Sequence, residues 1–501
     1  MPDSINLNGR PFHFIGIGGI GMSALAYILA KRNLPVYGSD LKSSHITQRL
    51  QELGVHVFLG QVASNLEIFN SEAASSSDVE ASRTKEVPLL PQIVCSTAIH
   101  PENAEYRAAL QLGCPIFHRS DLLAALIQEY KSVAVAGTHG KTTTSSLISY
   151  VLLEGGLDPT VLVGGEVKAW EGNARVGQSP YLVAEADESD GSLVKLSAQI
   201  GVITNIELDH PDHYESLHQV INTFQVFQSH CKTVVGCIDC ETVRDHIQPQ
   251  VSYSLHPETE ADYTVRQVTY DSQGSSAQVW ERGHLLGSLQ LKLLGFHNLS
   301  NALAAVAVGR LLGLEFETIA KALERFEGAK RRFEHRGEYN GIAFVDDYAH
   351  HPSEIQATLT AARLHLHPSS PIQRESIHKR IVAVFQPHRY SRTQTFLQEF
   401  AQCFNDADWV VVTDIYAAGE PNTVGIAGQQ VVDAIAGYHP NVCYQHSLAD
   451  VQQQLTECLQ PGDLAIFLGA GNLNQIIPQI IASLKRRQES TTKDNQPVGK
   501  H

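Results

Sequence analysis

Two glycine-rich loops, each lying between an apolar run and a helical pattern, constrain the fold of this chain most strongly. The first, "GIGGIG" at residues 16–21, follows the run "FHFI", and the second, "GTHGKT" at residues 137–142, follows "SVAVA". A glycine-rich turn between a strand and a helix is typical of parallel α/β sheets, where it receives the phosphate groups of a ligand. The sequence therefore predicts at least two α/β domains that each bind a phosphorylated ligand.

The first loop carries the dinucleotide-binding pattern G-x-G-x-x-G in Gly16, Gly18 and Gly21. Asp40 lies 19 residues after Gly21, at the end of the next apolar run. An acid at this spacing holds a ribose hydroxyl in dinucleotide-binding domains. Taken alone, this loop indicates an oxidoreductase that uses NAD or NADP.

The second loop contains the parts of a phosphate-binding loop and indicates a different chemistry. Gly140 allows close backbone approach, Lys141 neutralises phosphate charge, and the hydroxyl of Thr142 is a ligand for Mg²⁺. The loop is shorter than usual, because Val135 stands where the first glycine normally lies. We expect a nucleotide to contact the loop residues Gly137, Thr138, His139, Gly140, Lys141, Thr142 and Thr143. An oxidoreductase leaves this second loop unexplained.

Two later apolar runs end in side chains suited to a magnesium site. Glu185 ends the run "YLVAE", and His210 follows "VITNIELD". The alternative for the acids after Glu185, which are Asp187, Glu188 and Asp190, is a solvated acidic turn. A lone histidine is more often structural than a ligand, but this one ends a strand in the same predicted domain as the second loop.

Strand patterns alternate with helical patterns along almost the whole chain, which indicates α/β domains with parallel sheets covered by helices. The 501 residues exceed what one hydrophobic core supports. We expect a Rossmann-like domain at residues 1–130, a central P-loop ATPase-like domain at 131–330 and a second Rossmann-like domain at 331–487. The segments 70–86 and 488–501 contain few large apolar residues, so a disordered insertion and a disordered tail are expected.

The composition argues against several classes of partner. A net charge of −16 disfavours nucleic acid and an anionic membrane surface. No run approaches the roughly 20 apolar residues of a membrane span. The N-terminus lacks the pattern of a secretory leader, and the eight scattered cysteines are typical of reduced thiols. We therefore expect a cytoplasmic protein with no membrane insertion and no nucleic-acid partner.

Five motifs in this order resemble the Mur ligases, the ATP-dependent amide-forming enzymes of peptidoglycan synthesis. They are "GTHGKTTT", the strand-end Glu185, "TNIELDH", "GFHNLSNALAA" and "DDYAHHP", and the resemblance covers nearly the whole chain. Within the family, the first loop, "DDYAHHP" and "FQPHRYSRT" are similar to the members that ligate L-alanine to the lactyl carboxylate of UDP-N-acetylmuramate. The resemblance implies that the first loop binds this UDP-sugar and not NAD.

The resemblance also implies a binding role for each candidate residue. The UDP-sugar would be bound by Gly18, Gly19, Ile20, Gly21, Asp40 and Arg119. ATP, as co-substrate, would be bound by the second loop and by His297, Asn298, Asn301, Arg332 and Asp347. The C-terminal domain would close over this ATP. L-alanine would be bound by Tyr348, His350, Arg389 and Arg392, with the two arginines on one face if their turn is helical.

The resemblance implies metal and catalytic roles as well. Mg²⁺, as two ions, would be held by Thr142, Glu185 and His210. The catalytic side chains would be Lys141, Glu185, His210, Arg389 and Arg392. The sequence departs from several sister ligases, which carry a lysine modified by carbon dioxide after the acid–histidine pair. Counting 15 residues from His210 reaches Gln225, so no modified lysine is expected and the shell of the second ion is incomplete.

Three alternative functions are less well supported. A murein-peptide recycling ligase would attach a tripeptide to the same UDP-sugar, but the paired arginines of "HRYSR" suit a single small amino acid. An oxidoreductase uses only the first loop. A non-catalytic nucleotide-binding regulator would not need Glu185, His210 and the arginines together. A monomer or a dimer is expected.

Overall fold

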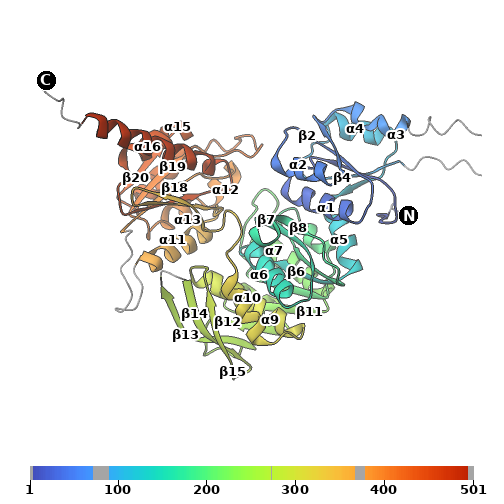
Figure 1. The fold of residues 1–501 in the computed structure, drawn as a ribbon, viewed down its shortest axis with the longest axis horizontal. Coiled ribbons are helices and arrows are strands. Elements are labelled where there is room, and N and C mark those ends of the chain that lie inside the picture. The colour runs from blue at the N-terminus through green and yellow to red at the C-terminus, as the bar shows by residue number, and fades with distance from the viewer. Residues whose placement is uncertain (1–3, 72–89, 272–273, 367–378, 495–501) are drawn as a thin grey trace, which may run out of the picture. The chain divides into compact units, whose positions relative to one another are not determined.

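The computed structural model, drawn in Figure 1, describes residues 4–71, 90–271, 274–366 and 379–494. The chain separates into two compact units. The first unit contains residues 1–206, 220–252 and 304–319, and the second contains residues 207–219, 253–303 and 320–501. The boundary falls within four elements, which are α7 (Leu217–His230), β12 (Val251–Ser254), α9 (Phe296–Leu311) and α10 (Phe316–Arg325).

The N-terminal part of the first unit is a five-stranded parallel sheet in the order β3-β2-β1-β4-β5. Its strands are β1 (Phe12–Ile15), β2 (Val36–Asp40), β3 (His56–Leu59), β4 (Gln92–Cys95) and β5 (Ile116–His118). Its helices are α1 (Ile20–Lys31), α2 (His45–Glu52), α3 (Ile68–Ser71), α4 (Ala104–Gln111) and α5 (Arg119–Glu129). Helices α1 and α2 lie on one side of this sheet, and α3 and α4 lie on the other (Figure 1). The first glycine loop connects β1 to α1.

The rest of the first unit contains strands in the order β11-β10-β6-β9-β7-β8, all parallel except for β8, which is antiparallel to β7. Their bounds are β6 (Lys131–Ala136), β7 (Thr160–Val167), β8 (Gly172–Arg175), β9 (Tyr181–Glu185), β10 (Ile200–Ile203) and β11 (Thr233–Cys237), with helices α6 (Lys141–Glu154) and α8 (Glu241–His246). Strand β6 is buried from Ser132 to Ala136, as expected for a parallel strand covered on both faces. The second glycine loop connects β6 to α6.

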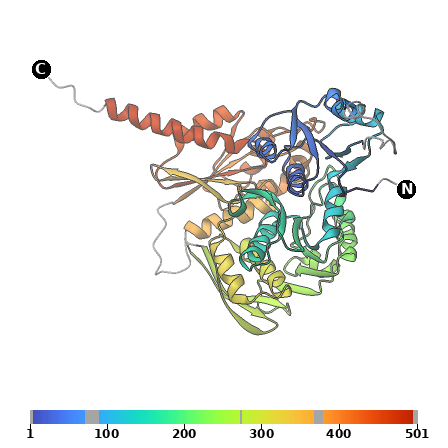
Figure 2. The same ribbon diagram turned by 45° about the vertical axis from the view of Figure 1, so that its right-hand side comes forward.

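The second unit contains two groups of strands. In the first group β12 pairs with β13 (Tyr263–Asp271), which continues into β14 (Gly274–Glu281) and β15 (His284–Leu291). The pairs β13–β14 and β14–β15 are antiparallel. These long strands appear in yellow-green in Figure 2. They are followed by α9, whose first two turns carry three of the predicted ATP-binding residues.

The C-terminal group is a six-stranded sheet in the order β16-β17-β21-β18-β19-β20, in which only β16 is antiparallel to its neighbour. Its strands are β16 (Glu334–Tyr339), β17 (Ile342–Asp347), β18 (Arg380–Phe385), β19 (Trp409–Thr413), β20 (Val442–Gln445) and β21 (Asp463–Leu468). Its helices are α11 (Pro352–Leu366), α12 (Tyr390–Thr395), α13 (Leu397–Gln402), α14 (Gly428–Ala436), α15 (Leu448–Cys458) and α16 (Ile477–Asp494). Neighbouring residues of one strand, such as Phe344 and Val345, belong to two different hydrophobic clusters, because successive side chains point to opposite faces of a sheet.

These mainly parallel sheets confirm the predicted α/β class. The expected insertion at residues 70–86 lies outside the described residues, except that its first two residues end α3. Helix α16 continues to Asp494, so the first part of the segment predicted as a disordered tail is helical, and residues 495–501 lie outside the described part. A polar sequence can extend a helix whose earlier turns are already packed, because elongation needs no new buried face. No helix among the described residues is long and apolar enough to cross a membrane.

Candidate active site

The second glycine loop has the backbone of a phosphate-binding loop. Gly140 is left-handed, with φ +81°, and Lys141 begins α6 directly after it. Gly137 also has positive φ, +144°, and a Cβ there would collide with the hydroxyl of Thr204. The end of β10 braces the loop, because the amide of His139 donates to Asn205 Oδ1 at 2.8 Å and the Thr204 hydroxyl donates to the His139 carbonyl at 2.6 Å. The loop is therefore fixed, with its backbone at a helix N-terminus.

The ammonium of Lys141 is fully engaged within the first unit. Its Nζ donates to the carbonyls of Gly137 at 2.7 Å and Thr138 at 3.2 Å, and it lies 2.9 and 2.8 Å from the two carboxylate oxygens of Glu188. Burial alone would lower the pKa of Lys141, but the carboxylates of Glu188 and Asp187 outweigh it and raise that pKa. Lys141 is therefore held as a cation at neutral pH.

Glu188 corrects the sequence interpretation of a solvated acidic turn. The residue is 1% exposed, and burial raises its pKa although the Lys141 ammonium opposes this shift. Its two acidic neighbours are engaged differently, because Asp187 and Asp190 each lie 3.2 Å from Nη2 of Arg119. Burial of a carboxylate is not visible in a run of acidic letters, so the sequence offered no signal for this pairing.

Thr142 and Glu185 lie together, as the magnesium prediction requires. The Thr142 hydroxyl donates to Glu185 Oε2 at 2.9 Å, and the amide of Gly164 donates to the same oxygen at 2.7 Å. A Cβ on Gly164 would lie 2.6 Å from the Glu185 carboxylate oxygens, so only glycine leaves room for them. A hydroxyl and a carboxylate are the hard oxygen ligands that Mg²⁺ prefers, so this pair fits the ion.

The first glycine loop is shaped by Asp40. The amide of Gly18 donates to Asp40 Oδ2 at 2.9 Å, and a Cβ on Gly18 would lie 2.8 Å from that oxygen. Gly19 is the N-cap residue of α1, followed by Ile20 and Gly21 in its first turn. Arg119, the first residue of α5, lies beside the loop, with Nη1 3.9 Å from a Cβ built on Gly21. The structure thus brings the predicted UDP-sugar residues together, and Asp40 supports the loop.

In the second unit, His210 is held by its neighbour Asp209 and by Arg392. His210 has φ +54°, and its amide donates to Asp209 Oδ1 at 2.6 Å. Arg392 Nε donates to the same oxygen at 2.8 Å, and both side chains are almost fully buried. Burial raises the pKa of Asp209, but Arg392 and the nearby histidines outweigh it and hold that pKa far below its usual range. Asp209 was not among the predicted site residues.

The two predicted alanine-binding arginines do not share a helical face. Helix α12 begins at Tyr390, and Arg389 precedes it as the N-cap residue with φ +66°. Arg389 donates to Asp212 at 2.9 Å, and its side chain is 35% exposed. The guanidinium of Arg392 points into the unit toward Asp209 and lies 3.2 Å from His388 Nδ1. Arg389 is therefore the accessible member of the pair, because a residue with φ above zero leaves the helical path.

Arg332, Asp347, Tyr348 and His350 gather at the carboxyl end of β17. The Asp347 carboxylate accepts from the amides of Phe333 and Ala349, each at 2.8 Å. Burial raises the pKa of Asp347 to about 6, although Arg332 opposes the shift. The guanidinium of Arg332 lies 5.1 Å from the centre of the Tyr348 ring, and the Tyr348 and His350 rings are 5.4 Å apart. The four residues form one group in the second unit.

His297, Asn298 and Asn301 lie in the first turns of α9, which begins at Phe296. Asn298 is therefore inside the helix and does not cap it, and its amide group donates to the carbonyl of Leu294 at 2.8 Å. Asn301 Nδ2 lies 3.4 Å from Asn298 Oδ1, which links the two amides. The three predicted adenine-site residues are thus neighbours at one helix end.

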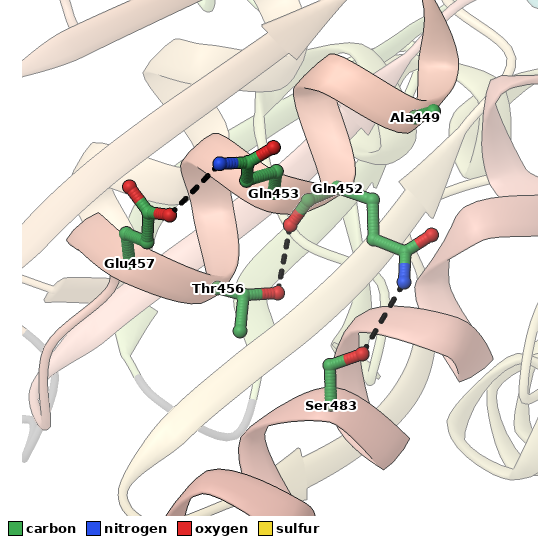
Figure 3. Close-up of a pocket in the computed structure, with 6 residues that line it drawn as sticks. All are labelled: Ala449, Gln452, Gln453, Thr456, Glu457 and Ser483. Carbon is green, nitrogen blue, oxygen red and sulfur yellow. Dashed lines mark hydrogen bonds between the residues drawn. The ribbon is translucent and has the colours of Figure 1, made fainter.

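A hollow between α15 and α16 is separate from these groups (Figure 3). It is lined by Ala449, Gln452, Gln453, Thr456, Glu457 and Ser483. Its polar side chains bond to one another, as Gln452 donates to Ser483 at 3.2 Å and Gln453 to Glu457 at 3.1 Å. None of the predicted site residues lines it.

Three family models match successive parts of the chain. The family model described as the catalytic domain of the Mur ligase family matches residues 11–131, the Mur ligase middle domain matches residues 135–309, and the Mur ligase glutamate ligase domain matches residues 331–471. The UDP-N-acetylmuramate–L-alanine ligase of Nostoc punctiforme is 62% identical over 492 residues, covering 98% of this chain and 100% of that protein. The enzyme of the same name from Trichormus variabilis is 62% identical over 496 residues, covering 97% of this chain and 98% of its own length.

Solved structures of similar proteins show the same architecture. The UDP-N-acetylmuramate-alanine ligase of Thermotoga maritima superposes with a TM-score of 0.75 at 28% identity, covering 96% of this chain and 99% of that one. A murein peptide ligase from Psychrobacter arcticus, at 22% identity, has a TM-score of 0.68 over 95% of this chain and 99% of its own, and shows the fold alone. The three domain matches and the full-length relatives together show that this chain belongs to the Mur ligase family.

Proposed function

We propose that this chain uses ATP to join L-alanine to the lactyl carboxylate of UDP-N-acetylmuramate, a step of peptidoglycan precursor synthesis. The observation that carries the proposal is the 62% identity, over nearly the whole length of both chains, to proteins named for that reaction. The phosphate-binding loop with its Thr142–Glu185 pair supports the use of ATP. NAD is therefore not proposed as a ligand, because in this function the first loop receives the diphosphate of the UDP-sugar.

The reaction needs an activated carboxylate, because amide formation from a free carboxylate in water is uphill. A carboxylate oxygen of the sugar attacks the γ-phosphorus of ATP, the bond to the bridging oxygen breaks, and ADP leaves. The alanine amine then attacks the acyl phosphate carbonyl, and the phosphate leaves with the carboxylate oxygen while the nitrogen loses a proton. Positioning and charge neutralisation are the main work of a protein in such a transfer.

Residues of both units are proposed to balance the charge of ATP and of the transferred phosphoryl group. Lys141, whose side chain is 12% exposed, is a cation at the start of α6 and can neutralise the β- and γ-phosphates. Thr142 and Glu185 would hold one Mg²⁺, and His210 would hold a second. Bound Mg²⁺ supplies positive charge where the phosphate and the carboxylate approach each other. His297, Asn298 and Asn301, with Arg332 and Asp347, are proposed for ATP in the second unit.

The second unit would also select the amino acid. Arg389 presents an accessible guanidinium that can bind a carboxylate in a bidentate manner. Arg392, whose guanidinium bonds to Asp209, is the second proposed alanine-binding arginine, and Tyr348 and His350 complete the proposed alanine site. The UDP-sugar is assigned to Gly18, Gly19, Ile20, Gly21, Asp40 and Arg119. We place the reaction in the cytoplasm, with the enzyme as a monomer or a dimer, and keep the domain boundaries predicted from the sequence.

The proposed reaction is tested by phosphate release from ATP in the presence of UDP-N-acetylmuramate and each of the twenty amino acids in turn. We expect release to be fastest with L-alanine. The same assay is run with a tripeptide, and faster release with the tripeptide than with any amino acid would support the recycling ligase. An increase in NADH fluorescence on addition of the protein would support the oxidoreductase.

A further inference from the structure

The donor count of Lys141 raises a question about how the loop receives phosphate. An ammonium has three N–H donors, and those of Lys141 face two loop carbonyls and both oxygens of the Glu188 carboxylate. Lys141 can therefore donate to a phosphate oxygen only by giving up one of these acceptors. The carboxylate of Glu188 is the acceptor that carries charge.

Glu188 is held in place by its own turn. The amide of Gly191 donates to the Glu188 carbonyl at 2.9 Å, and the amide of Ser192 donates to Asp190 at 3.0 Å. The flanking acids, Asp187 and Asp190, bond to Arg119. Within this turn, Glu188 bonds to Lys141, and Asp187 and Asp190 bond to Arg119.

We propose that Glu188 is a positioning residue whose carboxylate competes with nucleotide phosphate for the ammonium of Lys141, and so limits nucleotide affinity. This inference rests on the proposed function, in which Lys141 binds the phosphates of ATP. Glu188 keeps the buried cation paired whenever phosphate is not bound. Binding exchanges one anion for another at Nζ, and the reverse exchange helps ADP to leave after the reaction.

The energetic argument follows from the burial of the pair. Removing the carboxylate that is bonded to a mostly buried cation is costly, and the cost falls on the state in which nothing replaces that carboxylate. Glu188→Gln therefore destabilises the free protein more than the nucleotide complex, where phosphate pairs with Lys141. A ligand that binds the native state with higher affinity also stabilises it more against unfolding.

The test measures nucleotide affinity by calorimetry, without sugar or amino acid. We expect Glu188→Gln to bind ADP and a non-hydrolysable ATP analogue about 10- to 100-fold more tightly than the wild type, since one charge-assisted bond no longer competes. The affinity for adenosine, which has no phosphate, stays within about twofold. The melting temperature of free Glu188→Gln falls, and the nucleotide raises it by more than it raises that of the wild type.

Two controls separate positioning from a structural role. Asp190→Asn removes an acid from the same turn, but one that pairs with Arg119, so its affinity for the ATP analogue stays within about twofold of the wild type. In a Lys141→Met background the Glu188→Gln change has no effect on that affinity. If Glu188→Gln does not fold, Glu188→Asp takes its place. This variant shortens the side chain by one methylene, so a smaller increase in affinity for the ATP analogue is expected.

Unchanged or weaker binding of the ATP analogue by the Glu188 variant would overturn the inference. Equal effects on adenosine and on the ATP analogue would also overturn it, because they indicate a structural role. The failure of the proposed function looks different. A wild-type protein that binds the ATP analogue but forms no alanine product contradicts the function and leaves the competition between Glu188 and phosphate intact.

Discussion

At the scale of single residues, carboxylates hold the cations proposed for binding in each unit. Asp209 holds Arg392, Asp212 holds Arg389, and Glu188 holds Lys141. The buried pairs are strong constraints on position, whereas the exposed Arg389–Asp212 pair contributes little to stability and can be exchanged at low cost. Arg389 is therefore the cation best suited to exchange its partner for the carboxylate of a substrate.

Replacing Arg389 tests its proposed role in alanine binding. We expect Arg389→Ala to raise the KM for alanine by about 10- to 100-fold, because a charge-assisted hydrogen bond is lost, with a much smaller change in the KM for ATP. Arg389→Lys recovers only part of the affinity, since it offers a point charge in place of a planar fork. Steady-state kinetics with each substrate varied measures both effects.

The same variant should still activate the sugar. Hydroxylamine traps an acyl phosphate, and we expect trapping in Arg389→Ala at the wild-type level when alanine is omitted. Loss of trapping with an unchanged KM for alanine would mean that Arg389 serves phosphoryl transfer.

Asp347 predicts a pH dependence of stability. Burial raises its pKa to about 6, whereas the pKa of an aspartate in an unfolded chain is about 3.9. Between about pH 3.9 and 6 the folded state therefore binds a proton that the unfolded chain has lost. This contribution, about 3 kcal/mol, is complete below pH 4 and is lost as the pH rises through 6. Asp347→Asn removes the slope. Urea unfolding of both proteins from pH 4 to 7 measures it, and parallel pH profiles would contradict the assignment.

At the scale of elements, strand ends position the chemistry. The loops after β1 and β6 and the end of β9 carry most of the site residues predicted for the first unit, and the sequence predicted these positions because apolar runs end there in glycine or polar residues. The expectation for His210 was wrong, because β10 ends at Ile203 and the chain continues without regular structure to His210, which belongs to the second unit. The sequence also predicted that Thr142 and Glu185 meet. It could not predict which acid of "ADESD" is buried, because neighbouring letters carry no information on tertiary contacts. The helical face proposed for Arg389 and Arg392 failed because the positive φ of Arg389 places it outside α12.

Gly164, within β7, tests the arrangement around Glu185. Gly164→Ala puts a Cβ 2.6 Å from the Glu185 oxygens, so the carboxylate must move. We expect the Mg²⁺ concentration for half-maximal activity to rise about 10- to 100-fold, as for other changes beside a metal ligand. Gly437→Ala is the matched control, because a Cβ there stays 3.4 Å from its nearest neighbour. An unchanged magnesium requirement in Gly164→Ala would remove Glu185 from the metal site.

At the scale of the whole molecule, the strands form three sheets, and several α/β domains were predictable from two glycine loops and the order of the motifs. The length of α16 was not predictable, because the polar sequence of its last turns carries no periodic signal. The family matches cover each of the three parts in turn. If separate parts bind separate ligands, a substitution in one part should change the affinity for its own ligand and not for the others.

Lys141→Ala tests this separation of sites. We expect it to abolish ligation while the affinity for UDP-N-acetylmuramate stays within about twofold of the wild type, because distant sites respond independently. Calorimetry with the UDP-sugar alone measures the affinity. A loss of sugar binding as large as the loss of ATP binding would show that the two loops form one site.

The central claim, activation of the lactyl carboxylate as an acyl phosphate, is tested most directly by an oxygen isotope. UDP-N-acetylmuramate labelled with ¹⁸O in that carboxylate is converted with ATP and L-alanine, and the released phosphate is analysed by mass spectrometry. The account predicts that each phosphate released from fully labelled sugar carries one ¹⁸O atom and that the alanyl product keeps the other. Unlabelled phosphate, with alanine joined to the sugar, would contradict it.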